Sequence, residues 1–240
     1  MDDRYAKPPI TEAVIEIRAG DPLAEAKVRK AAKAIGKRYR QTEELREFTM
    51  TVGSNAPVAS KVVGFRLVSE DALFVAQPRK KGLAFSALAP YPGWTAFTAE
   101  FTEVWKLWKK GTGGQRTDRI GVRFLNRIDI PHEEGKTLDS DDYLSVGIRL
   151  PLSTGNFSNA WQVGSLCPVQ GTRFMVRIQC GTVKAAILNA ASYSLDLDFY
   201  CEVDVPQSDN DILALLDEVK PIKNRVFEEC ITDKTRALLS

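Results

Sequence analysis

The chain places three arginines at steps of four residues in the segment RIGVRFLNRIDI, which runs from position 119 to position 130. In an extended strand successive side chains point to opposite faces, so this segment separates into an apolar face and a polar face. The apolar face comprises Ile120, Val122, Phe124, Ile128 and Ile130, and the polar face comprises Arg119, Arg123, Arg127 and Asp129. A guanidinium stays charged and donates two parallel hydrogen bonds, which suits it to carboxylates and phosphates. The segment predicts a half-buried strand with an arginine row on its polar face.

A second segment, Ser192 to Val203, carries the opposite charge on its polar face. Alternation places apolar side chains on one face and Asp196, Asp198 and Tyr200 on the other. Two aspartates on one strand face can bind a hard divalent cation, but a magnesium site usually adds a third carboxylate or a phosphate. We therefore expect ion pairing at Asp196 and Asp198, and no metal site.

Two interpretations of these charged strands remain open. In the first, five charged residues form a surface that binds a partner or an anion. In the second, the arginines pair across strands with the aspartates or with Glu12 and Glu16, each pair contributing about 0.2 to 1 kcal/mol to stability. The five residues are Arg119, Arg123, Arg127, Asp196 and Asp198. The sequence does not decide between a recognition surface and a structural one.

Residue types that usually carry catalysis are scarce. His132 is the one histidine, so most sites that combine histidine with serine, cysteine or a metal are disfavoured. The cysteines lie 13, 21 and 29 positions apart without a CxxC pair, which predicts buried free thiols rather than zinc ligands. They are Cys167, Cys180, Cys201 and Cys230. We expect no catalytic residue and no cofactor, and a binding protein rather than an enzyme.

The charge of the chain is nearly balanced, with 33 basic and 31 acidic residues and a formal net charge of +2. A protein that binds nucleic acid over its whole surface usually has a strong basic excess, so nucleic-acid binding is an alternative only for a local patch. The residues of such a patch are Arg79, Lys80, Lys81, Lys106, Lys109, Lys110 and Arg116, with Tyr91 and Trp94 as stacking faces. No apolar run approaches the roughly 20 residues of a membrane span, and the N-terminus is unlike a signal sequence. We expect a cytoplasmic protein without a membrane segment.

Alternation, apolar periodicity and turn residues predict the secondary structure. The expected strands are Ile10–Ala19, Leu45–Val52, Lys61–Val68, Leu73–Ala76, Leu83–Leu88, Arg119–Ile130, Tyr143–Leu150, Trp161–Val169, Arg173–Cys180 and Lys184–Val203. The expected helices are Leu23–Ile35 with Asp21 as its N-cap, Trp94–Lys110 with an aromatic stripe, and the region Asp209–Leu239, opened by Ser208. Pro221 should kink or divide that last region because proline removes an amide donor and crowds the preceding turn.

These elements predict an α+β fold of two similar antiparallel sheet-plus-helix halves packed together, with a long C-terminal helical region. The N-terminal half covers residues 1–135 and the C-terminal half residues 136–240, joined near Pro131 to Ser140. A length of 240 residues also fits one integrated domain, because domains usually contain about 100 to 200 residues.

Four stretches of sequence together resemble a sporadically distributed, uncharacterised bacterial protein family of about this length. They are PITEAVIEIR at 9–18, YPGWTAF at 91–97, the arginine strand at 119–131 with its RFLN core, and LDLD at 195–198 followed by FEECIT at 227–232. The resemblance covers essentially the whole chain and implies a cytosolic protein of a single architecture with no established catalytic residues. The patchy distribution of that family fits accessory genes such as defence or toxin-antitoxin loci.

We therefore expect a non-enzymatic binding protein that recognises a partner protein through the arginine and aspartate strands, in a bacterial defence or toxin-antitoxin setting. One alternative is a sensor or enzyme that binds a phosphorylated small molecule or nucleotide in an arginine-lined cleft. In that alternative Arg119, Arg123 and Arg127 clamp the anion, and Asp196 or Asp198 holds magnesium. A second alternative is nucleic-acid binding through Arg79 to Lys81.

Overall fold

A computed structural model of the chain describes residues 5–49, 59–132, 138–148 and 160–240. The described residues form one antiparallel sheet of nine strands in the order β2-β3-β4-β5-β1-β6-β9-β8-β7. The strands are β1 (Ile10–Ala19), β2 (Arg40–Thr49), β3 (Ala59–Val68), β4 (Phe74–Arg79), β5 (Gly82–Leu88), β6 (Thr117–Pro131), β7 (Gln162–Pro168), β8 (Met175–Val183) and β9 (Ala190–Cys201). Because β6 lies between β1 and β9, the arginine row runs along the middle of the sheet.

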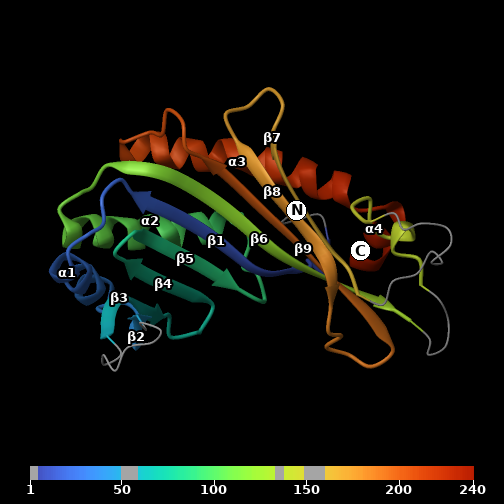
Figure 1. The fold of residues 1–240 in the computed structure, drawn as a ribbon, viewed down its shortest axis with the longest axis horizontal. Coiled ribbons are helices and arrows are strands. Elements are labelled where there is room, and N and C mark those ends of the chain that lie inside the picture. The colour runs from blue at the N-terminus through green and yellow to red at the C-terminus, as the bar shows by residue number, and fades with distance from the viewer. Residues whose placement is uncertain (1–4, 50–58, 133–137, 149–159) are drawn as a thin grey trace, which may run out of the picture.

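The helices leave one face of the sheet uncovered. In the described part of the chain they are α1 (Glu25–Ile35), α2 (Trp94–Thr112), α3 (Asp209–Cys230) and α4 (Asp233–Leu239), together with the 3-10 turn η1 (Ser140–Asp142). In Figure 1 α2 and α3 lie behind the strands, and α1 packs against α2 and against β3 and β4. The sheet thus has a helix-covered face and an opposite face, which we call the open face.

The hydrophobic core lies between the sheet and the helices. Phe85 of β5 is fully buried there, with its ring centroid 5.7 Å from that of Phe97 and 6.0 Å from that of Phe101, both on α2. Gly111 lets α1 and α2 approach closely, because a Cβ atom at this position would lie 2.3 Å from the Cα atom of Ala31. The aromatic stripe of α2 is buried as the sequence predicts.

The alternation predicted for the arginine strand is confirmed in β6. Its apolar residues face the core and are at most 1% exposed; they are Ile120, Val122, Phe124, Ile128 and Ile130. The α+β class and the antiparallel sheet are confirmed as well. In the described ranges, no helix is long and apolar enough to cross a membrane.

Three predicted boundaries in the first half of the chain are wrong. Strand β2 begins at Arg40 and not at Leu45. Helix α1 begins at Glu25 with Ala24 as its N-cap, and Asp21 does not cap it. The Leu23 amide instead donates to the Lys80 carbonyl at 2.7 Å, which ties the segment before α1 to the turn between β4 and β5. Strand β4 continues beyond the predicted Ala76 to Arg79, which lies opposite Gly82, so the turn consists of Lys80 and Lys81.

The C-terminal part also differs from the predicted elements. Of the two outcomes predicted at Pro221, division of the helix is wrong: α3 continues through it, and the buried residues Val219 and Ile222 pack the same side of the helix into the core. The helical region is instead divided after Cys230, and α4 begins at Asp233. The strand predicted over Tyr143–Leu150 is absent from its described part, residues 143–148, which has only an isolated bridge from Leu144 to Ile231. Residues 149 and 150 lie outside the described ranges.

Candidate functional site

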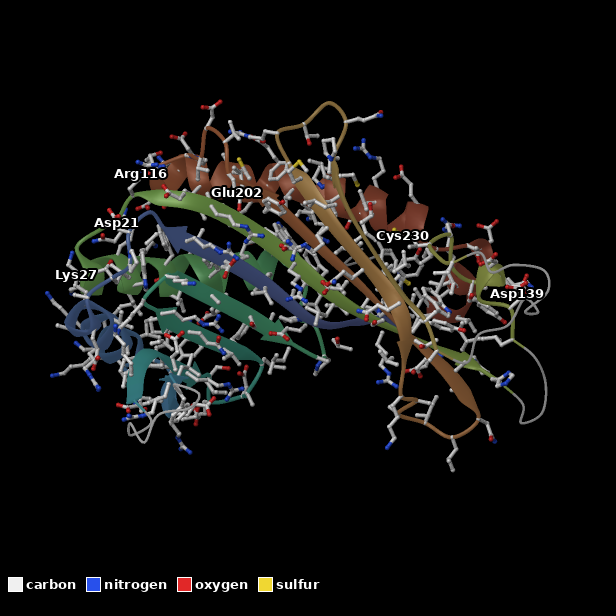
Figure 2. The ribbon with its side chains drawn as sticks, in the orientation of Figure 1. Asp21, Lys27, Arg116, Asp139, Glu202 and Cys230 are labelled. Carbon is white, nitrogen blue, oxygen red and sulfur yellow. The ribbon has the colours of Figure 1, made fainter. Side chains whose placement is uncertain are left out.

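The candidate site is the centre of the open face, where β6 lies beside β9. Arg123 lies opposite Asp198 in the register of these strands, and Leu125 lies opposite Asp196. The same side of β1 contributes Glu16, which lies opposite Gly121. Figure 2 shows many nitrogen- and oxygen-bearing side chains over these strands. The fold therefore brings together the two charged segments that the sequence singled out.

Arg119 is the most buried member of the arginine row, with 7% of its side chain exposed. Its Nη1 donates to Glu16 at 2.7 Å, and its Nη2 donates to Asp198 at 3.0 Å. Its Nε lies 3.3 Å from a carboxylate oxygen of Glu202, and the guanidinium stands 4.4 Å from the ring centroid of Tyr200. Arg119 thus joins β1, β6 and β9, and its donors are used inside the protein.

Arg123 is paired but accessible. Its Nε donates to Asp196 at 2.8 Å and its Nη2 donates to the second oxygen of the same carboxylate, while 45% of its side chain remains exposed. Arg127 donates from Nε to Asp129 at 2.9 Å and from Nη2 to the Lys184 carbonyl at 2.8 Å. The pairing fixes both guanidinium groups, and that of Arg123 faces solvent.

The electrostatics of the site centre on Asp198. Burial raises the pKa of its carboxyl group, and the positive charges of Arg119 and Arg123 oppose that rise. Arg123 has a raised pKa because it hydrogen bonds to Asp196. Asp198 therefore depends on its arginine neighbours to remain charged inside the sheet.

The structure shows the cross-strand pairing that the sequence left as one of two interpretations. Arg119 and Arg123 pair with Asp198 and Asp196, and Arg127 pairs with Asp129 on its own strand. Asn126 behaves as a structural amide, because it is buried and its Nδ2 donates to the Leu195 carbonyl at 2.9 Å. Pairing and recognition are compatible at Arg123, whose side chain is both held and exposed.

Apolar side chains accompany the charges on the open face. Leu166 of β7 lies opposite Arg177 of β8, which in turn lies opposite Asp198 of β9. The exposed fraction of Leu166 is 52%. Val183 of β8 lies opposite Ser192 and is 39% exposed. The outer part of the open face therefore offers apolar contacts beside the polar centre.

No cluster of three or more histidine, cysteine, aspartate or glutamate side chains among the described residues is arranged to hold a metal ion. The backbone amide of His132 donates to the Asn189 carbonyl at 2.8 Å, which anchors the end of β6 to the start of β9. The carboxylates of Asp196 and Asp198 each form an ion pair with an arginine guanidinium.

The cysteines are free thiols, of which Cys180, Cys201 and Cys230 are buried and Cys167 is partly exposed. Burial raises the pKa of Cys180 to about 11 and that of Cys230 to about 12, and it also raises the pKa of Cys201. Because the thiolate is the nucleophile, we expect Ellman's reagent to modify Cys167 quickly in the folded protein and the other three only after denaturant is added. Cys167→Ser should remove the fast phase, and a fast phase from a second thiol would contradict this assignment.

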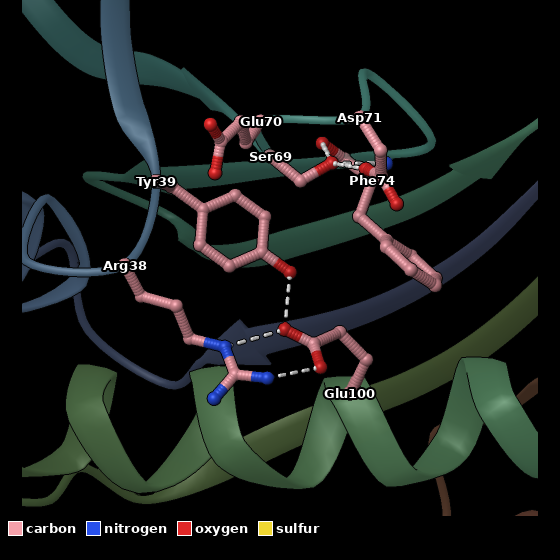
Figure 3. A pocket seen from close by; sticks show the side chains of 7 residues that line it. All are labelled: Arg38, Tyr39, Ser69, Glu70, Asp71, Phe74 and Glu100. Atoms are coloured by element: carbon pink, nitrogen blue, oxygen red, sulfur yellow. Dashed lines mark hydrogen bonds and ion pairs between the residues drawn. The ribbon is translucent and has the colours of Figure 1, made fainter.

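A separate hydrogen-bond cluster lies on the helix-covered side, in a hollow of about 530 Å3 (Figure 3). Arg38 donates through Nε and Nη2 to both carboxylate oxygens of Glu100, at 2.7 and 2.6 Å, and the Tyr39 hydroxyl donates to the same carboxylate at 2.7 Å. Burial raises the pKa of Tyr39, and the hydrogen bond to Glu100 adds to the rise. These contacts hold α2 against the segment before β2, and we assign them a structural role.

The members of the patch considered for nucleic acid have different surroundings in the structure. Trp94 is 3% exposed and belongs to the core, so it offers no stacking face. Several of the cations outside the β4–β5 turn have carboxylate partners: Lys106 pairs with Glu103, Lys109 with Asp209, and Arg116 with Asp118. Arg79, Lys80 and Lys81 instead line one hollow with Arg18 and Arg46, which the sequence did not associate with them.

Comparison of the chain with models of known protein families and with curated protein sequences gave no match.

Proposed function

We propose that this chain is a non-enzymatic binding protein that recognises a partner protein through the open face of its sheet. The observation that carries the proposal is a nine-stranded sheet whose helices cover one face, while the other presents an accessible guanidinium, Arg123, held by Asp196. Free thiols in all four cysteines fit a reducing compartment, so we place the protein in the cytoplasm. The resemblance noted above adds a bacterial defence or toxin-antitoxin setting to the proposal.

The geometry of Arg123 supports recognition of a protein surface. Its Nε and Nη2 groups bond to Asp196, and its Nη1 donors make no hydrogen bond to a described residue. A guanidinium that is already held loses less side-chain entropy when a carboxylate or carbonyl of a partner binds to it. Arginine on the same face as exposed apolar residues, here Leu166 of β7 and Val183 of β8, is a common composition for protein interfaces.

The strand order supports two similar halves, which we include in the proposal. Outward from the centre the strands read β1, β5, β4, β3 and β2 on one side and β6, β9, β8 and β7 on the other. In each half, the strand that comes first in the sequence, β1 or β6, lies at the centre of the sheet. The strand that comes last, β5 or β9, lies beside it and is followed in the sequence by a helix, α2 or α3. This arrangement favours a boundary between α2 and β6 over one near residue 135, and it makes the open face a surface shared by both halves.

The test compares Arg123 with a matched arginine elsewhere. Arg173 forms the same two-point pair with Glu218 and is 42% exposed at its side chain, close to the 45% of Arg123. In affinity purification from cells of the source organism, we expect Arg123→Ala combined with Arg127→Ala to lose a stoichiometric protein partner that Arg173→Ala retains. An exposed ion pair contributes about 1 kcal/mol or less, so the double variant Arg123→Ala with Arg127→Ala, like Arg173→Ala, should fold normally by circular dichroism.

Two outcomes would contradict the proposal. One is retention of the same partner by the double variant at unchanged yield. The other is the absence of any stoichiometric partner for the unmodified chain in cells that express it at its natural level.

A further inference from the structure

A hollow of about 640 Å3 opens where the end of β1 meets the β4–β5 turn and parts of β2 and β3. It borders the candidate site through Glu16, but neither Arg123 nor any residue of the hollow beside α2 lines it. Five cationic side chains line it: Arg18, Arg46, Arg79, Lys80 and Lys81. Two carboxylates, Glu16 and Glu47, also line it, so the hollow carries an excess of positive charge in a protein that is nearly neutral overall.

The nearby carboxylates do not neutralise this excess. Glu16 is shared between Arg18, at 3.0 Å, and Arg119, at 2.7 Å. Neither Arg79 nor Lys81 forms an ion pair with a carboxylate of the described residues, and the one side-chain bond of Arg79 there is a donation to the neutral amide of Gln77. Two cations therefore face the hollow with their charge unbalanced.

The other cations of the hollow are weakly or only partly compensated. Lys80 lies 4.0 Å from Glu25, and Arg46 shares Glu44 with Arg29. A carboxylate divided between two guanidinium groups leaves donors of both available to a further anion.

The hollow is preformed by the backbone around it. The Lys80 amide donates to Val63 at 2.8 Å, and the Lys81 carbonyl accepts from Ala19 at 2.9 Å. Gly82 closes the turn at φ 139°, and a Cβ atom there would lie 1.9 Å from the Ile17 carbonyl oxygen, so the turn presses directly against β1. A cationic site held in this way loses little conformational entropy when an anion binds.

The lining is apolar between the cations. The apolar side chains accessible there are those of Pro22 and Val63, while Ile17, Leu83 and Ala84 also line the hollow but are buried. A volume of about 640 Å3 lies within the range of roughly 300 to 1,000 Å3 that is typical of small-molecule sites. The ligand that matches this lining has an uncharged organic body and several negative charges at one end.

We propose that this hollow binds a small organic molecule with two or more phosphate groups, of the class of nucleoside diphosphates. Arg79 and Lys81 contact the phosphates, together with Arg18 and Arg46, and the apolar lining receives the body of the molecule. None of the residues that line the hollow is aromatic, which disfavours a single-stranded nucleic acid held by base stacking. The proposal does not depend on partner recognition at Arg123.

The test measures binding of ADP and inorganic pyrophosphate by calorimetry, with sulfate and a single-stranded oligonucleotide as comparison ligands. We expect ADP and pyrophosphate to bind with submillimolar affinity that decreases as salt is added. Arg79→Gln combined with Lys81→Gln should weaken both by at least about tenfold, because two charge-assisted contacts to phosphate are lost. Lys30→Gln with Lys33→Gln, the same change of charge at exposed positions of α1, should leave binding unchanged.

The outcomes separate this proposal from its competitors. Equal binding by both double variants would overturn it, as would a failure of the unmodified protein to bind ADP at millimolar concentration. Sulfate binding as tight as pyrophosphate would overturn the requirement for two phosphates, and binding of the oligonucleotide in place of ADP would assign the hollow to nucleic acid. Arg123→Ala should not change the affinity for ADP. A failure of the protein to bind ADP would therefore not contradict the proposed recognition of a partner protein at Arg123.

Discussion

Arg119→Met should lower the free energy of unfolding by about 3 kcal/mol, because it leaves the largely buried carboxylate of Asp198 without its ion-pair partner. Arg119 contacts Glu16, Asp198 and Glu202, and 18% of the Asp198 side chain is exposed, so water compensates this carboxylate poorly. Methionine keeps the hydrocarbon volume of the side chain but offers neither charge nor donors. Chemical denaturation monitored by tryptophan fluorescence measures the change.

The pH dependence of this loss identifies its cause. Removal of Arg119 removes a charge that opposes the raised pKa of Asp198, so that pKa should rise further in the variant. A carboxyl group with a raised pKa in the folded state stabilises that state below its unfolded pKa, and this contribution is lost as the pH rises through the folded pKa. The loss in free energy of unfolding caused by Arg119→Met should therefore be largest near neutral pH. It should shrink as the pH falls toward 3.8, the ordinary pKa of an aspartate.

The control is the same substitution at Arg123, on the same strand. Its side chain is 45% exposed, so the loss of its pair should cost about 1 kcal/mol or less. Equal losses for the two variants, or a deficit of Arg119→Met that does not change with pH, would show that Asp198 does not depend on Arg119.

Phe85→Ala should destabilise the protein by about 3 to 5 kcal/mol, the usual cost of a large cavity in a packed core. The Phe85 side chain is fully buried, and its ring contacts four others, those of Tyr39, Phe74, Phe97 and Phe101. These rings come from β4, from α2 and from the residue before β2, so they cannot close around the missing side chain without moving the helix. The midpoint of denaturant unfolding reports the change.

Phe48 provides the matched control for this substitution. It lies on β2 with an exposed fraction of 65%, so Phe48→Ala creates no cavity and should change stability by less than about 0.5 kcal/mol. A comparable loss at both positions would contradict the assignment of Phe85 to the centre of the core.

Short-range patterns predicted most of the elements. Alternation along β6 placed Phe124 in the core and Arg123 outside, because the side-chain period of a strand is fixed by backbone geometry. Aromatic spacing in α2 predicted its buried stripe in the same way. The errors fall where contacts distant in sequence decide: the Leu23 bond to Lys80 delays the start of α1, and core packing carries α3 through Pro221.

For the candidate sites too, local patterns predicted which residues share a strand face, and the tertiary structure decided which of them come together. The sequence alone determined that arginines and aspartates occupy the polar faces of two strands, since that follows from residue identity and the period of two. Only the tertiary structure decided that Arg119 is buried among three carboxylates while Arg123 is exposed, because exposure depends on which strands lie alongside. It also decided that Arg18 and Arg46 join Arg79 and Lys81 around one hollow, because residues from separate strands meet only when the sheet forms and no local pattern encodes that meeting.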